Sequence, residues 1–175
     1  MKKMSSLFLL LMSVLLMTVS SCSKNDSCPN GFTGSNCSQQ KNPVQIQVTK
    51  VTVTNFPSTR LDGTDWNLTE SAGHADIYPT IADSSGNVVF TFRSVYLSNA
   101  SNANNNIFTL STPIILSNPL SSYTFTLFNW NSVAADDNMG SITKIIYNSS
   151  NNFPTTINLD NGAGLTFQLT VQYVY

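Results

Sequence analysis

Hydrophobic and polar residues alternate in short segments along most of the chain, with the period of two that is typical of half-buried β-strands. The clearest segment is 165–175, in which Leu, Phe, Val and Tyr residues share one face while Thr and Gln share the other. Segment 44–53 alternates in the same way but changes phase after Val48, which predicts a bulge or a bend. Because no segment has capped helical spacing, the pattern predicts an all-β fold.

Further strand-like segments follow at short intervals and are separated by turn-forming residues. They are residues 77–81, 88–96, 107–110, 114–116, 123–130, 142–147 and 155–159. Ser84-Ser85-Gly86-Asn87 predicts a hairpin turn, Pro113 separates two of the short strands, and the Asn-rich segment 98–106 predicts an exposed loop. Eight or nine short strands with turns between them predict an antiparallel β-sandwich over residues 44–175.

The first 21 residues do not follow this pattern. Lys2 and Lys3 precede an apolar run over 7–17 that only Ser13 interrupts, and small residues follow. This arrangement is typical of a secretion signal that is removed from the mature protein. The alternative, a membrane-spanning helix, requires about 20 apolar residues, and the run is shorter than that.

Val19-Ser20-Ser21-Cys22 resembles the lipobox of bacterial lipoproteins, which has an apolar residue, two small residues and then a cysteine. The resemblance implies that Cys22 receives a diacylglycerol, becomes the new N-terminus and is acylated, so that several chains anchor the protein stably. Lys24 and Asp26 resemble, with only two charged residues, the charged stretch that directs lipoproteins of the Bacteroidetes group to the outer face of the membrane. We therefore expect a lipid-anchored protein of the bacterial cell envelope, on the outer membrane and facing outward.

The composition narrows the possible partners. Charged residues make up 10% of the 175 residues, well below the usual share of about 25%, and Asn, Ser and Thr take their place. The formal net charge is −1, so the chain has no basic field that would attract nucleic acid. It also has no polybasic patch that would hold an anionic membrane. The length fits one domain with additional segments.

Residues 22–43 are expected to form a tether between the lipid and the domain. Cys28 and Cys37 remain once Cys22 carries lipid, and an exported protein meets an oxidising compartment. Two glycines and Asn30-Gly31 favour a tight reversal that brings the two thiols together. Segment 28–37 resembles the last loop of epidermal-growth-factor-like modules over ten residues, although the module's other four cysteines are missing. We expect a disulfide-closed spacer rather than a binding element; a metal site would need further ligands.

Two segments concentrate acidic and amide side chains, which are the ligands that calcium prefers. Segment 129–140 resembles the third calcium loop of the calcium-and-lipid-binding C2 domain. The predicted calcium ligands are Asn67, Asp76, Asn129, Asn131 and Asp137, with Asp62 or Asp65 as alternatives to Asn67. In segment 61–78, Ala75-Asp76-Ile77-Tyr78 resembles the Ser-Asp-Pro-Tyr that opens a strand in this family. The resemblance implies a C2-like sandwich.

Asn occupies three of the five positions that are acidic in the C2 family: 67, 129 and 131. Each replacement removes a negative charge, and calcium affinity depends strongly on the charge of the ligands. We therefore expect any calcium site to be weak or lost. The alternative is that these loops keep the family's shape through Asx turns and bonds from side chains to the backbone.

The sequence contains no catalytic constellation that we recognise. His74 is the single histidine, Gly-x-Ser-x-Gly is absent, and the adjacent Asp136 and Asp137 would point apart on a strand. The leading hypothesis is a non-catalytic binding or scaffold module with an unknown protein or glycan partner. A carbohydrate-binding accessory lipoprotein is the alternative, with Trp66 and Trp130 as exposed platforms rather than packing residues. A hydrolase that uses His74 or Asp76 is a third.

Overall fold

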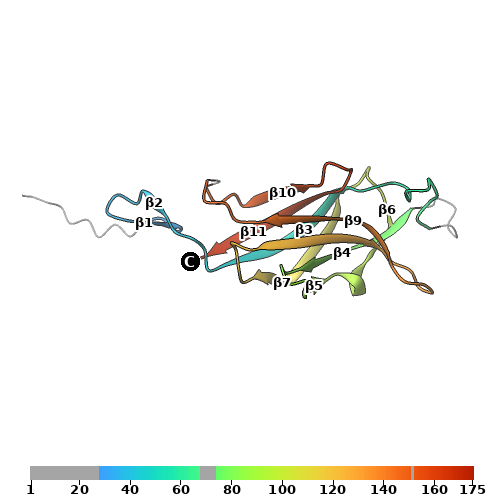
Figure 1. Ribbon diagram of the computed structural model, residues 1–175, viewed down its shortest axis with the longest axis horizontal. Coiled ribbons are helices and arrows are strands. Elements are labelled where there is room, and N and C mark those ends of the chain that lie inside the picture. The colour runs from blue at the N-terminus through green and yellow to red at the C-terminus, as the bar shows by residue number, and fades with distance from the viewer. Residues whose placement is uncertain (1–27, 68–73, 151) are drawn as a thin grey trace, which may run out of the picture.

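The computed structural model describes residues 28–67, 74–150 and 152–175 (Figure 1). The expected signal peptide, Cys22 and Glu70 lie outside these residues. The described chain is built from antiparallel strands, with one 3-10 turn, η1 (Arg93–Val95), as its single helical element. No helix in this part of the chain has the length and apolar character needed to cross a membrane.

A small hairpin of β1 (Phe32–Thr33) and β2 (Gln39–Gln40) precedes the sandwich. The first sheet has the order β10 (Thr156–Asp160), β11 (Thr166–Val174), β3 (Gln45–Asn55), β7 (Asn106–Leu116). The second has the order β5 (Val88–Thr91), β4 (Ala75–Ala82), β8 (Ser122–Asn129), β9 (Asp137–Ile145), and β6 (Leu97–Ala100) also pairs with β4. The nine sandwich strands in the described residues confirm the predicted eight- to nine-stranded antiparallel fold.

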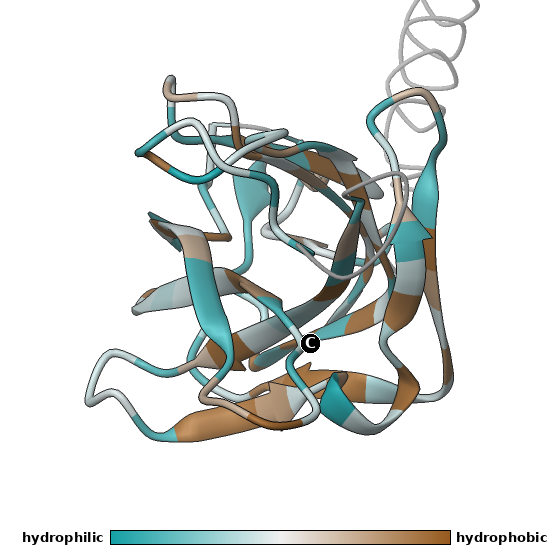
Figure 2. Ribbon diagram, turned by 90° about the vertical axis from the view of Figure 1, so that its right-hand side faces the viewer, coloured by the Kyte–Doolittle hydropathy of each residue, from teal (hydrophilic) through white to brown (hydrophobic). Residues whose placement is uncertain are grey.

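The core lies between the two sheets and follows the alternation of the sequence, which is visible along the strands in Figure 2. In β8 every second side chain is buried, and in β11 the apolar set from Phe167 to Val171 is buried as predicted. Phe125 and Phe167 meet across the core with ring centroids 6.2 Å apart. Each large apolar side chain that is fully buried contributes about 1.5–3 kcal/mol relative to an exposed one.

The predicted bulge is present in β3. Its register shifts between Val48 and Lys50 against β7, and between Thr170 and Val171 against β11. The Thr49 hydroxyl donates to the Thr170 carbonyl over 3.2 Å, so the side chain takes part in the irregular ladder. This bend allows both phases of the 44–53 pattern to face the core.

Two strand predictions need correction. Segment 88–96 is not one strand, because Phe92 turns into the core against Phe108 and η1 follows before β6 begins. Segments 107–110 and 114–116 belong to a single strand, β7, which passes through Pro113. β7 lies at a sheet edge and is irregular there, and such positions tolerate a proline that donates no hydrogen bond.

The sandwich has two ends with different contents. We call the end that carries the β1–β2 hairpin and the C-terminus the anchor end, where the Val44 N–H donates to the Val174 carbonyl over 2.7 Å. We call the opposite end, which carries loops 56–67, 101–105, 130–136 and 161–165, the loop end (Figure 1). The two segments with predicted site residues therefore meet at the loop end.

Candidate functional site

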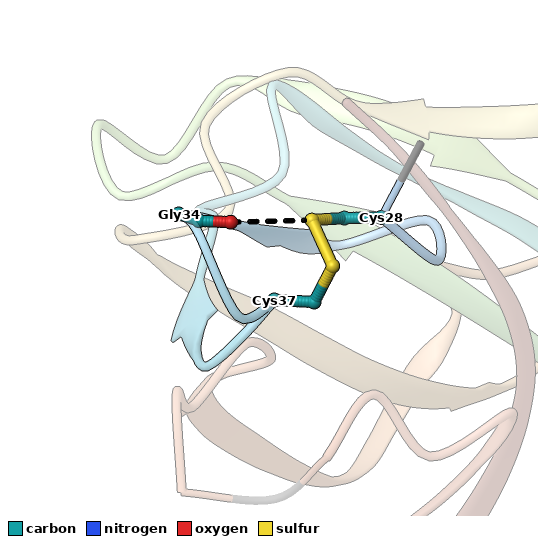
Figure 3. The surroundings of a disulfide bond; sticks show 3 residues. All are labelled: Cys28, Gly34 and Cys37. Atoms are coloured by element: carbon teal, nitrogen blue, oxygen red, sulfur yellow. Dashed lines mark hydrogen bonds between the residues drawn. A yellow bond between two sulfur atoms is a disulfide. The ribbon is translucent and has the colours of Figure 1, made fainter. Parts of the chain in front are cut away.

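At the anchor end, Cys28 and Cys37 form the expected disulfide (Figure 3). The two cysteines are nine residues apart, and their Cα atoms are 5.3 Å apart. The Gly34 carbonyl oxygen lies 3.5 Å from Cys28 Sγ. Because a disulfide sulfur carries no proton, this approach is a contact and not a hydrogen bond. The disulfide closes the turn between β1 and β2.

The hairpin packs on the domain instead of standing apart from it. The Phe32 ring meets the Phe153 ring edge-on at 5.7 Å, and Phe153 in turn lies 5.2 Å from Tyr175. Gly31 makes the closest approach: a Cβ there would lie 2.5 Å from Phe153 Cε2 and 2.7 Å from Tyr175 Oη. Gly31 also has a φ of +90°, so both conformation and space call for glycine. The expected spacer is thus a docked element.

Asn129 lies at the centre of the loop end. Its side chain is fully buried, and its Oδ1 accepts the Asp76 N–H over 2.9 Å. Its Nδ2 lies 3.4 Å from Asn67 Oδ1. The strand register explains this position, because Asn129 at the end of β8 pairs with Asp137 of β9 on one side and with β4 on the other. One amide therefore connects the two predicted site segments.

Asp137 is paired with an arginine from a different loop. Arg60 Nη2 donates to Asp137 Oδ2 over 2.7 Å, and Asn131 Nδ2 donates to the same oxygen over 3.2 Å. Partial burial opposes ionisation, but the hydrogen bonds from Arg60 and Asn131, together with one from Asn129, lower the pKa of Asp137 below its usual range. The carboxylate is thus ionised and already neutralised by the protein.

Asp136 shares Asn131 with Asp137 but pairs with the other arginine. The Tyr78 hydroxyl and Arg93 Nε donate to Asp136 Oδ2 over 2.7 and 2.6 Å, and the Asn131 N–H donates to Oδ1 over 2.9 Å. Although burial opposes ionisation, the bonds from Arg93, Tyr78 and Asn131 lower the pKa of Asp136 to about 2. Burial and the Asp136 carboxylate raise the pKa of Tyr78 to about 12. The network fixes the conformation of loop 130–136.

Asp76 has a structural role in this arrangement. Its side chain is buried, with 8% of the residue exposed, and its Oδ1 accepts the Asn99 N–H over 2.9 Å. Its carbonyl accepts the Trp130 N–H over 2.6 Å. Asn99 has a φ of +54°, so the Asp76 carboxylate stabilises an uncommon backbone conformation beside the loop. Asp76 therefore holds β6 and the start of loop 130–136 in place.

The predicted calcium ligands come together, and their polar atoms are engaged with one another and with Arg60. Asp137 Oδ2 already accepts from Arg60 and Asn131, and Asn129 Oδ1 accepts from the Asp76 backbone. Asn131 presents its Nδ2, a donor, to Asp137 rather than its oxygen. Within the described ranges, no group of three or more His, Cys, Asp or Glu side chains is arranged to hold a metal ion. The bonds between side chains and backbone are of the kind expected for loops that keep their shape without a bound ion.

The two tryptophans differ in their surroundings. Trp66 is buried, with 6% exposed, and its Nε1 donates to the Pro57 carbonyl over 2.7 Å, which fits the packing alternative and not an exposed platform. Trp130 is partly exposed and stacks on Tyr96, with ring centroids 4.4 Å apart and planes 6° apart. Trp130 is thus the ring that remains accessible for a ligand.

The remaining candidates lie apart from the Asp137 cluster. His74 lines a cavity of about 170 Å³ with Phe56, Ala100 and Asn102. Asp62 accepts from the Thr64 N–H and hydroxyl, and closes its own turn. Asp65 contributes its carbonyl to Arg60 Nη1 over 3.2 Å. None of these side chains joins the cluster as a ligand.

Sequence reasoning did not find Arg60 and Arg93. They are the two arginines of the chain, and both pair with carboxylates of segment 129–140. Their rarity was the sequence signal that could have found them. Because the chain has few charged residues, the two arginines would be expected to form ion pairs with the adjacent carboxylates of Asp136 and Asp137.

Comparisons with known proteins found distant similarities among solved structures. No protein-family model matches the chain, and no curated protein matches it. Among solved structures, the chain is similar to "Structure of a C2 domain", with 15% identity and a TM-score of 0.46, over 73% of this chain and 97% of the other. It is also similar to a C2 domain of plant extended synaptotagmin 1, with 14% identity and a TM-score of 0.33, over 77% and 99%.

A third similar structure is human GIVD cytosolic phospholipase A2, with 16% identity and a TM-score of 0.49. The match covers 77% of this chain but 18% of the phospholipase, so the chain spans less than a fifth of that enzyme's length. Likenesses of this degree say nothing about the ligand of the loop end.

Proposed function

We propose that this chain is a lipid-anchored, non-catalytic binding module of a bacterial outer membrane, facing outward. Cys22 carries the lipid, residues 22–43 form the tether, and the sandwich presents its loop end to a protein or glycan partner. The single observation that carries the proposal is the position of the disulfide-closed hairpin, which is docked at the end opposite the loops.

The geometry of the anchor supports this orientation. Cys22 lies six residues before Cys28, a stretch that spans at most about 20 Å. The hairpin that follows is held by Phe32 and Gly31 against Phe153 and Tyr175. The loop end lies a further strand length away, about 35 Å for the 11 residues of β3. A lipid on Cys22 therefore places the anchor end near the membrane and the loop end away from it.

The state of the carboxylates supports binding rather than catalysis. A general acid or base needs a pKa near the working pH, whereas Asp136 and Asp137 have lowered pKa values and are paired with Arg93 and Arg60. Both carboxylates are engaged in fixing loop geometry. A surface whose loops are already ordered loses little conformational entropy when it binds a partner.

Lipidation is tested by expressing the full chain in a Bacteroidetes host and analysing the membrane fraction by mass spectrometry. We expect the N-terminal peptide to begin at Cys22 and to carry diacylglycerol and acyl mass. The Cys22→Ser variant should leave the membrane fraction, and a Ser23→Ala control should remain in it. Wild-type protein that is released in unmodified form would contradict the proposal.

A glycan partner is the second candidate, and the accessible Trp130–Tyr96 stack is the observation that favours it. An exposed aromatic ring offers a flat apolar face on which the apolar face of a sugar ring can pack. A glycan array followed by tryptophan fluorescence titration tests it. We expect Trp130→Ala to abolish any response and Trp66→Phe to leave it unchanged. A response that persists in Trp130→Ala would contradict the assignment of this ring.

A further inference from the structure

Arg60 is held in a fixed position by its own loop. Two backbone hydrogen bonds close the turn around it. The Arg60 N–H donates to the Thr64 carbonyl over 2.8 Å, and the Gly63 N–H donates to the Arg60 carbonyl over 3.0 Å. Its guanidinium donates to the Asp65 carbonyl over 3.2 Å and lies 5.7 Å above the centre of the Trp66 ring. These contacts restrict the guanidinium to one position beside the Trp66 ring.

The guanidinium joins two loops that are far apart in the sequence. Its Nη2 reaches Asp137, 77 residues further along the chain, over 2.7 Å. Asp137 is also tied to Asn131, whose Nδ2 donates to the Ala135 carbonyl over 3.1 Å. The positive charge therefore sits among carboxylate, carbonyl and amide groups that belong to both loops. This is the kind of position that a bound cation occupies when it orders two oxygen-rich loops.

We propose that Arg60 is a resident cation that clamps loop 56–67 to loop 130–136, in place of a metal ion, and makes the loop end independent of divalent cations. A metal bound to Asp137 Oδ2 at about 2.4 Å would lie within about 5 Å of the guanidinium and be repelled by it. The inference rests on the Arg60–Asp137 geometry and holds whether or not the chain is lipid-anchored.

The clamp has a functional consequence. A metal-ordered loop responds to the concentration of the metal, whereas an intramolecular guanidinium is always present and always charged. The loop end is then ordered in any calcium concentration. The ion pair is partly exposed, with 28% of the Arg60 and 36% of the Asp137 side chain accessible, so high salt weakens the clamp where chelators do not.

Hydrogen exchange of the purified full chain tests the proposal, in EDTA and in about 10 mM calcium chloride, above the range of extracellular calcium modules. We expect wild-type amides of 131–137 to exchange at the same rate in both. In Arg60→Gln they should exchange at least about fivefold faster in EDTA, and calcium should restore part of the protection by binding the released Asp137. Lys144→Gln, which removes the same charge at the anchor end of β9, should behave as wild type.

Asp137→Asn provides the second variant, because it removes the carboxylate and leaves Arg60 in place. It should exchange faster in EDTA and show no response to calcium, and it should abolish the calcium response when combined with Arg60→Gln. Calcium-dependent protection in the wild type would overturn the proposal. So would wild-type exchange rates in Arg60→Gln, since the clamp would then be dispensable, or fast exchange there that calcium leaves unchanged.

Discussion

The loop end depends on a few charged side chains whose ionisation is set by their neighbours. Asp136 is the clearest case: Tyr78, Arg93 and the Asn131 N–H all donate to it, and 10% of its side chain is exposed. Its pKa of about 2 in the folded chain lies below the ordinary value of 3.8. The contribution to stability is therefore fully present above about pH 4, and is lost as the pH falls through about 2.

Asp136→Asn should lower the free energy of unfolding at pH 7 by about 1–2 kcal/mol, a range that allows for solvent screening of the exposed Arg93. The loss should shrink below pH 4 and vanish below about pH 2, where wild-type Asp136 is itself protonated. Urea unfolding of both proteins at several pH values measures this difference. A loss that stays constant between pH 7 and pH 2 would show that the carboxylate charge is not the cause.

At the anchor end, replacing Tyr147 is expected not to reduce the stability of the fold, in contrast to replacing Asp136. Tyr147 is buried among aromatic rings, and its hydroxyl has no hydrogen-bond partner among the described residues. A buried hydroxyl without a partner costs about 1–3 kcal/mol. Tyr147→Phe should therefore leave stability unchanged or raise it by about 1 kcal/mol, measured as a higher melting temperature. Tyr173→Phe is the control, because it removes a 3.0 Å bond to the Pro154 carbonyl and should destabilise.

The sequence predicted the acidic and amide half of the site but not its cationic half. The resemblance to the C2 calcium loops placed Asn129, Asp76 and Asp137 together, and in the structure they lie at the neighbouring ends of paired strands. Arg60 reaches Asp137 across 77 residues, and no local pattern records which side chain neutralises which across such a distance. Which atom of each amide faces the carboxylate is also a property of the folded loops alone.

At the level of elements, the sandwich itself was predictable because burial repeats every second residue. The bulge of β3 was readable from the phase change after Val48. The end of β5 was not, because Phe92 continues the apolar pattern while its side chain turns into the core against Phe108. Likewise, Pro113 predicts the end of a strand in the sequence. In the structure β7 continues through Pro113, because β7 lies at the edge of its sheet.

The docking of the hairpin is the element-level feature that the sequence did not reveal. Gly31→Ala places a Cβ against Phe153 and Tyr175 and should push the hairpin off the domain. Limited proteolysis should then cut within 38–43 much faster than in the wild type, while the sandwich stays folded. Gly34→Ala is the matched control, because its φ of +91° carries the same strain but its Cβ would meet only Gln39 of the hairpin. Equal cleavage in both variants would place the effect in backbone strain alone.

At the scale of the whole molecule, the proposal places lipid, hairpin and sandwich in series. The disulfide fixes the hairpin, the Phe32–Phe153 contact fixes the hairpin on the sandwich, and the strands carry the loop end away from that point. At the far end, both arginines of the chain hold the two loops in one conformation. In this proposal the protein is a rigid support that presents an ordered loop surface away from its own membrane.

Energy transfer in vesicles tests this arrangement most directly. The full lipidated chain carries a donor dye at Leu120→Cys, in the turn after β7 at the anchor end, or at Val133→Cys, at the tip of loop 130–136. The acceptor is a labelled lipid headgroup. We predict strong transfer from position 120 and weak transfer from position 133, with the difference reduced by Gly31→Ala. Equal transfer from both positions, or stronger transfer from position 133, would contradict the proposed orientation.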